Sequence, residues 1–195
     1  MPPQTAEHTI RAADPSEIDA LAAGMTKAFS DDPYMRWLLE DAPPDTVEMY
    51  FKAQLLWGFD SGLVETTDKT EGCAIWLPDD SEPPAKIAAR LMIFSFACRR
   101  FNFRPVYVSP VPDVAEYSIL QFVAAFNTNR GIGTALLNHG AQILDTNGRP
   151  AYLEASTPDS ERLYAKLGYR AIGKVHLKDG GPKKIPMWRE PQFVT

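Results

Sequence analysis

Cysteine and histidine are scarce in this chain, and neither is spaced as a metal site would require. The 195 residues include two cysteines, Cys73 and Cys98, and three histidines, at positions 8, 139 and 176. Two distant cysteines provide neither a disulfide framework nor a zinc pattern, which is typical of a reducing compartment. We interpret all three histidines as structural or surface residues. The sequence therefore predicts no metal centre.

Long apolar runs and an excess of positive charge are also missing. Residues 1–7 are polar and lack the apolar core of a signal peptide, and no apolar run reaches membrane-spanning length. The net charge of −5 disfavours a nucleic-acid partner, because a phosphate backbone attracts a basic surface. These absences predict a cytoplasmic protein with no membrane and no nucleic-acid partner. The length suits a single domain spanning 1–195.

What the chain does contain is a strand–loop–helix pattern at residues 116–146. Residues 116–123 (EYSILQFV) form an apolar run typical of a buried strand. Four apolar residues then recur at helical spacing: Ile132, Ala135, Leu136 and Ile143. In the intervening loop, Gly131 and Gly133 lack a Cβ atom, so the backbone can approach a ligand. Such a helix start is a site for phosphate or pyrophosphate. Because Gly-x-Gly alone is a weak signal, a helix start packed through small residues is the alternative.

The rest of the chain alternates between helical and strand patterns. Strands are expected at 9–13, 62–67, 72–77, 116–123, 151–155, 169–177 and 184–188, and helices at 14–29, 34–39, 45–59, 86–103, 131–146 and 157–167. This order predicts an α/β protein with a mixed, twisted sheet of about seven strands flanked by helices.

Several segments resemble one enzyme family. Residues 130–137 (RGIGTALL) resemble the acyl-CoA loop of the Gcn5-related N-acetyltransferases (GNAT), whose pattern is Gln/Arg-x-x-Gly-x-Gly/Ala. Residues 151–156 (AYLEAS) and 160–169 (SERLYAKLGY) are similar to the next strand and helix of that fold. Residues 28–33 (AFSDDP) and 74–78 (AIWLP) are similar to its puromycin-acetyltransferase-like branch. The resemblance follows the chain from end to end and implies the GNAT fold, with a helical insertion before the fourth strand.

The resemblance also implies an activity: transfer of an acetyl group from acetyl-CoA, as co-substrate, to an amine of a small molecule. It assigns ten residues to the donor: Val123, Ala124, Thr128, Asn129, Arg130, Gly131, Ile132, Gly133, Thr134 and Ser160. Among them, backbone N–H groups of Val123 and Ala124 are expected to face the thioester carbonyl. The sequence departs from the family at Thr128, where Gln or Arg is usual, and at Ser160, where Asn is frequent. A protein that binds CoA without catalysis, or one recruited to other biosynthetic chemistry, is the alternative.

Two residues are the candidates for proton transfer, again by resemblance. Tyr164 matches the helix tyrosine near the CoA sulfur, and Glu154 matches a strand-end carboxylate placed to accept a proton from the amine. Structural alternatives exist for both. Tyr164 can be a helix residue packed on the sheet, and Glu154 can be ion-paired with Arg149 or Arg162.

The acceptor is expected to bind near residues 29–37 and near the insertion at 78–112. Asp31 and Asp32 either cap the following helix or form an acidic mouth for a cationic amine. Phe29 and Tyr34 either line that mouth or belong to the core. The insertion contains a basic amphipathic helix with Phe94 and Phe96. That helix either packs on the domain or, as the resemblance implies, forms a wall of the acceptor pocket.

Overall fold

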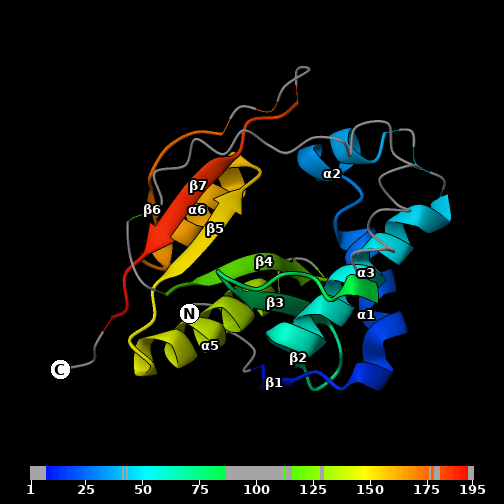
Figure 1. Ribbon diagram of the computed structural model, residues 1–195, viewed down its shortest axis with the longest axis horizontal. Coiled ribbons are helices and arrows are strands. Elements are labelled where there is room, and N and C mark those ends of the chain that lie inside the picture. The colour runs from blue at the N-terminus through cyan, green and yellow to red at the C-terminus, as the bar shows by residue number, and fades with distance from the viewer. Residues whose placement is uncertain are drawn as a thin grey trace, which may run out of the picture.

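The computed structural model describes residues 8–40, 42, 44–86, 112, 116–127, 130–175, 177 and 181–192 (Figure 1). The predicted helix at 86–103, including Phe94 and Phe96, lies almost wholly outside the described residues, as does most of the insertion. Thr128 and Asn129 of the predicted donor loop also lie outside them. What the sequence indicates for these positions stays a prediction.

The described residues form one mixed sheet with the predicted number of strands. Its seven strands have the order β1-β2-β3-β4-β5-β7-β6. Their bounds are β1 Ile10–Ala12, β2 Leu63–Thr67, β3 Gly72–Pro78, β4 Ser118–Ala125, β5 Ala151–Ala155, β6 Arg170–Ala171 and β7 Ile185–Arg189. Neighbouring strands are antiparallel except β4 and β5, which are parallel. The prediction of a mixed α/β sheet is therefore confirmed.

The parallel pair at the centre of the sheet is very short. β4 and β5 pair only at Ser118 with Ala151 and at Ile119 with Tyr152, although β4 continues for six more residues. Figure 1 shows β5 and β7 turning away from β4 beyond this point. A bulge accompanies the divergence, because Ile75 pairs with Phe122 but Trp76 pairs with Leu120, which leaves Gln121 as an extra residue of β4. The sheet therefore opens on the side of β4 that faces β5.

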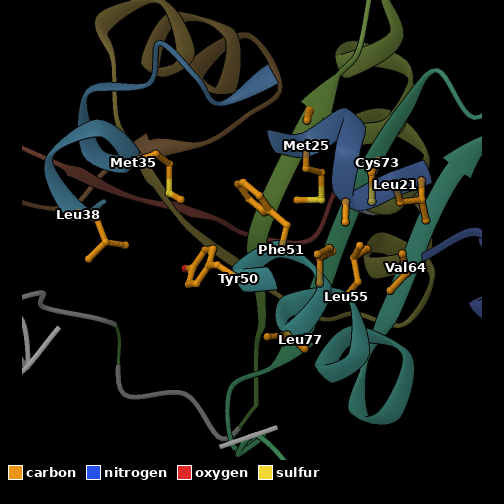
Figure 2. Packing of buried hydrophobic residues seen from close by; sticks show 13 residues of the cluster. Leu21, Met25, Met35, Leu38, Tyr50, Phe51, Leu55, Val64, Cys73 and Leu77 are labelled. Carbon is orange, nitrogen blue, oxygen red and sulfur yellow. The ribbon is translucent and has the colours of Figure 1, made fainter. Parts of the chain in front are cut away.

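Helices cover both faces of the sheet. They are η1 Pro15–Glu17, α1 Ile18–Ala28, α2 Pro33–Leu38, α3 Pro44–Ser61, α5 Ile132–Thr146 and α6 Pro158–Lys166. Side chains alternate along β3: Cys73, Ile75 and Leu77 join the core cluster under α1 and α3, whereas Ala74 and Trp76 join the cluster under α5. Figure 2 shows the first cluster. Burial on both faces explains the continuous apolar sequence of β3.

Two elements differ from their predicted bounds, each for a physical reason. Asp14 caps the short helix η1, as its Oδ1 accepts a hydrogen bond of 2.8 Å from Ser16 N, and α1 follows it. The strand predicted at 169–177 is reduced to β6 and one isolated bridge between Val175 and Lys184. Ile172, the first residue after β6, lies opposite Pro186 of β7. Because proline has no N–H group, this pair forms only one of the two ladder hydrogen bonds, from Ile172 N to Pro186 O at 2.9 Å, and the strand ends here.

Candidate active site

The divergence of β4 and β5 opens a cavity of about 410 Å³. Its walls come from α2, α3, β4, β5 and α6, from the residue that follows α1 and from the residue before β7. Six of the predicted site residues line it: Phe29, Asp32, Tyr34, Val123, Glu154 and Tyr164. The fold thus brings together residues separated by more than 130 positions in the sequence.

Asp32 caps a helix and lines the cavity at the same time. Its Oδ1 accepts a hydrogen bond of 2.9 Å from Met35 N at the start of α2, and its Oδ2 accepts one of 2.5 Å from Ser156 Oγ. The two alternatives considered for this residue are therefore compatible. Asp31 is exposed and is not among the residues that line the cavity.

Glu154 is held by two neighbours. Its Oε1 accepts a hydrogen bond of 2.9 Å from Tyr152 OH, and its Oε2 forms an ion pair with Lys184. Neither of the arginine partners considered from the sequence is correct. Arg149 lies near Asp79 and Glu116, and Arg162 pairs with Asp159. Antiparallel pairing of β5 with β7 explains the lysine partner, because Ala155 opposes Ile185 and so brings residue 184 to the end of β5.

Tyr164 combines packing with a position on the cavity wall. It projects from α6, is 9% exposed and belongs to the core cluster under α5. Burial raises the pKa of its phenol to about 12, and the negative charge of Asp32 adds to the increase. The side chain therefore keeps its proton at neutral pH and can donate a hydrogen bond into the cavity.

The glycine loop has the backbone geometry expected of an anion site. Gly131 is the N-cap of α5 with φ of 76°, a left-handed conformation that favours glycine. A Cβ atom added at Gly133 would meet nothing within 4 Å, so the backbone there is open to a ligand. The side chain of Ile132 is buried in the core and anchors the loop, whereas Thr134 is half-buried in the first turn of α5.

Two predicted donor residues already have partners within the protein. Arg130 Nη1 pairs with Glu71 Oε1 at 2.7 Å, and the carbonyl of Arg130 is 2.6 Å from His8 Nε2. Ser160 Oγ bonds Thr157 in the capping box of α6, donating to its carbonyl at 2.9 Å. Its hydroxyl therefore stabilises the start of a helix.

The β4 backbone distinguishes Val123 from Ala124. Phe126 N donates to Glu71 O at 2.7 Å, which extends the antiparallel ladder of β3 and β4. Because bonded and non-bonded pairs alternate along such a ladder, the N–H of Ala124 points toward β3 and that of Val123 points toward β5. β5 no longer pairs with β4 at this level. Val123, which is also among the residues that line the cavity, is therefore the better placed of the two predicted donors.

Comparison with solved structures identifies the architecture. A histone acetyltransferase HPA2 and related acetyltransferase from Corynebacterium glutamicum matches with a TM-score of 0.72 at 23% identity, over 96% of this chain and 98% of that chain. The chain has the GNAT fold. Arylalkylamine N-acetyltransferase 2 from Aedes aegypti matches with a TM-score of 0.62 at 10% identity, covering 95% and 100% of the two chains.

A third GNAT-fold structure contains acetyl-CoA. It is yncA from Salmonella typhimurium with its cofactor, which matches with a TM-score of 0.58 at 15% identity over 97% of each chain. No family model matches this sequence. The predicted GNAT fold is thus confirmed by structure.

Several lining residues were not predicted from the sequence: Tyr50, Tyr117, Gln121, Tyr152, Ser156 and Lys184. Tyr152 was accessible to sequence reasoning, because it is two positions from Glu154 and so lies on the same face of β5. Lys184 was not, because its place opposite Ser156 depends on the register of β5 and β7. Among the described residues, no three His, Cys, Asp or Glu side chains gather as a metal site, and no helix is long and apolar enough to span a bilayer.

Proposed function

We propose that this protein is an N-acetyltransferase that moves an acetyl group from acetyl-CoA to a primary amine of a small molecule by direct transfer. The observation that carries the proposal is the cavity between the diverging strands β4 and β5, which has a backbone N–H group, a protonated phenol and a carboxylate on its walls. These groups match the needs of acyl transfer to an amine.

The donor half of the proposal rests on the start of α5. Gly131 and Gly133 leave backbone room, and the N-terminal turn of a 15-residue helix favours an anion such as the CoA pyrophosphate. Arg130 contributes positive charge beside it, although Glu71 partly neutralises that charge. Thr128, Asn129, Ser160 and the puromycin-acetyltransferase-like branch stay predictions from the resemblance.

The catalytic half uses three groups of the chain. The thioester, when bound, supplies an acyl group that is already activated, so positioning counts most. Glu154 accepts a proton from the acceptor ammonium, and the free amine then forms a C–N bond as the C–S bond breaks. The N–H of Val123 donates to the carbonyl oxygen, on which negative charge develops. Tyr164 donates a hydrogen bond to the departing thiolate and keeps its own proton. The thiolate takes up the second proton that the nitrogen loses as the amide forms, and Glu154 releases the first proton to solvent.

The cavity favours a small acceptor with an aromatic or apolar body. Phe29, Tyr34, Tyr117 and Phe122 line it, and its volume of about 410 Å³ suits a compact molecule. Among the similar structures, one is named a histone acetyltransferase and another an arylalkylamine N-acetyltransferase. The aromatic walls support the second kind of acceptor. Phe94 and Phe96 stay candidates for a further wall, and a cytoplasmic location with neither membrane nor nucleic-acid partners stays a prediction.

The ion pair of Glu71 with Arg130 supports one alternative function, because an acidic side chain beside the loop weakens the binding of an anion. The rival is a GNAT-fold protein that binds CoA or another ligand without transferring an acyl group. A thiol-release assay with acetyl-CoA and a panel of amines decides between them. We expect release with at least one aromatic or aliphatic primary amine, and none from Gly131→Asp, whose side chain opposes the pyrophosphate by bulk and charge. Binding of acetyl-CoA without release for any amine would favour the rival.

A further inference from the structure

An ammonium group of the protein itself lies in the cavity. Lys184 Nζ pairs with Glu154 Oε2 and lies 4.0 Å from the centroid of the Tyr34 ring. The side chains of Lys184 and Glu154 are only 15% and 10% exposed, so the contact is largely withdrawn from water. A carboxylate combined with an aromatic face is an arrangement in which proteins bind ammonium groups. We call the Tyr34 ring and the Glu154 carboxylate the cation site.

The cation site is rigid on the protein side. Tyr152 OH donates to the other oxygen of Glu154 at 2.9 Å, which fixes the carboxylate on β5. Tyr34 is in the first turn of α2, whose start is capped by Asp32. Burial raises the pKa of the Tyr34 phenol, so its ring stays neutral. Lys184, which occupies the site, is flexible by contrast, because its ammonium group lies at the end of a four-carbon chain with rotatable bonds.

We propose that the cation site receives the ammonium group of the acceptor, and that Lys184 is an internal competitor that must leave before the acceptor binds. The inference rests on the proposed function, because it takes the acceptor to be an amine. Lys184 lies directly before β7 and next to the exposed Lys183, and its side chain is itself 15% exposed, so its flexible stem can carry the charge to solvent.

The exchange also sets which acceptors enter. With Lys184 in place, its charge cancels that of Glu154. With Lys184 turned outward, Glu154 and Asp32 leave two negative charges on the cavity wall. The site then attracts a cationic amine and disfavours an acceptor that carries its own carboxylate. Lys184 is in this sense a specificity-determining residue, and an acceptor must bind well enough to displace it.

The experiment measures binding by calorimetry at pH 7 in the absence of acetyl-CoA. The probes are 2-phenylethylammonium and 2-phenylethanol, which share a ring and differ in charge. The variant is Lys184→Met, which keeps an apolar stem and removes the ammonium, and its neighbour Lys183→Met is the control. We expect Lys184→Met to bind the ammonium probe about tenfold more tightly than wild type, as an ion pair with a cation–π contact would allow. The alcohol should be unaffected, and Lys183→Met should match wild type for both probes.

Three results would overturn the inference, the first being that Lys184→Met binds the ammonium probe no more tightly than wild type. An equal gain for ammonium and alcohol would mean that the substitution only enlarges the cavity. Weaker ammonium binding, or none, would mean that Lys184 builds the site instead of competing for it. If Lys184→Met melts well below wild type, Lys184→Gln replaces it with the same expectation. Thiol release tests the proposed function separately. Tighter binding of the ammonium probe to Lys184→Met, with no thiol release by wild type, would contradict the acetyltransferase activity and support the cation site. Thiol release by wild type, without tighter binding to Lys184→Met, would support the activity and contradict the competition by Lys184.

Discussion

Replacing Tyr164 by Phe tests whether its phenol acts on the departing thiolate. The substitution removes one oxygen and keeps the ring that packs in the core. A hydrogen bond to a charged group is worth about 1.5–3 kcal/mol, so turnover should fall roughly 10- to 150-fold. Affinity for acetyl-CoA should be nearly unchanged, because the phenol is not needed for the pyrophosphate or the adenine.

The pKa of Tyr164 fixes the expected pH dependence. With a pKa of about 12, the phenol is protonated throughout pH 6–9, and its hydrogen bond is lost only as the pH rises through that value. The ratio of wild-type to Tyr164→Phe turnover should therefore be constant between pH 6 and pH 9. A thiol, with a reference pKa of about 8.5, is the stronger acid, so the phenol donates a hydrogen bond without giving up its proton.

Tyr169 is a matched control for this substitution. It is buried beside Tyr164, with ring centroids 6.0 Å apart, but it is not among the residues that line the cavity. Its hydroxyl has no hydrogen-bond partner within the described part of the chain. Steady-state thiol release should show a loss for Tyr164→Phe and little change for Tyr169→Phe. Similar turnover in both variants, or an alkaline limb near pH 8 that disappears in Tyr164→Phe, would refute the reasoning.

Three further substitutions probe the loop and the framework. Thr128→Gln should leave CoA affinity equal or up to about tenfold better in calorimetry, because a longer amide can reach a phosphate oxygen, and a large loss would contradict this. Asp145→Asn should lower the unfolding free energy by about 1–3 kcal/mol at pH 7, because Asp145 pairs with the buried Arg189 at 2.6 Å. Hydrogen bonds from Arg189 lower the pKa of Asp145, so this difference should shrink in denaturant titrations as the pH falls below the ordinary pKa of an aspartate, and a constant difference would count against it. His139→Ala removes a partner 2.5 Å from the buried Glu65, whose pKa burial already raises. The substitution leaves an oxygen of the buried Glu65 carboxyl without its partner, so the unfolding free energy should fall by about 1–3 kcal/mol at pH 7 in denaturant titrations, and an unchanged value would exclude this contact as a source of stability.

The order of the elements was predictable because each has a strong local pattern. The local signals are the continuous apolar run of β3, the capping residues Asp14 and Thr157, and the glycine at the start of α5. They predicted a sheet of seven strands and placed most elements within a few residues of their bounds. β6 was overestimated because the effect of Pro186 acts across a strand pair, which a single sequence does not reveal.

The site was less predictable because its contacts join distant segments. The family resemblance supplied Tyr164 and Glu154, but the partner of Glu154 depends on strand register, and an arginine close in sequence was the wrong candidate. In the same way, the sequence assigned Asp32 either to a helix cap or to the cavity. The structure shows both, because one carboxylate oxygen caps α2 and the other accepts a hydrogen bond from Ser156 in the cavity wall. Val123 and Ala124 were predicted as equivalent, although the ladder orients their N–H groups in opposite directions.

That difference has a consequence for hydrogen–deuterium exchange. Two successive amides in the middle of a central strand would ordinarily be protected to a similar degree. Here the amide of Ala124 is directed to β3, whereas the amide of Val123 faces a side of β4 that β5 has already left. Without ligand, the deuterium uptake of Val123 should therefore exceed that of its neighbour, and a bound thioester that accepts its hydrogen bond should slow Val123 while leaving Ala124 unchanged.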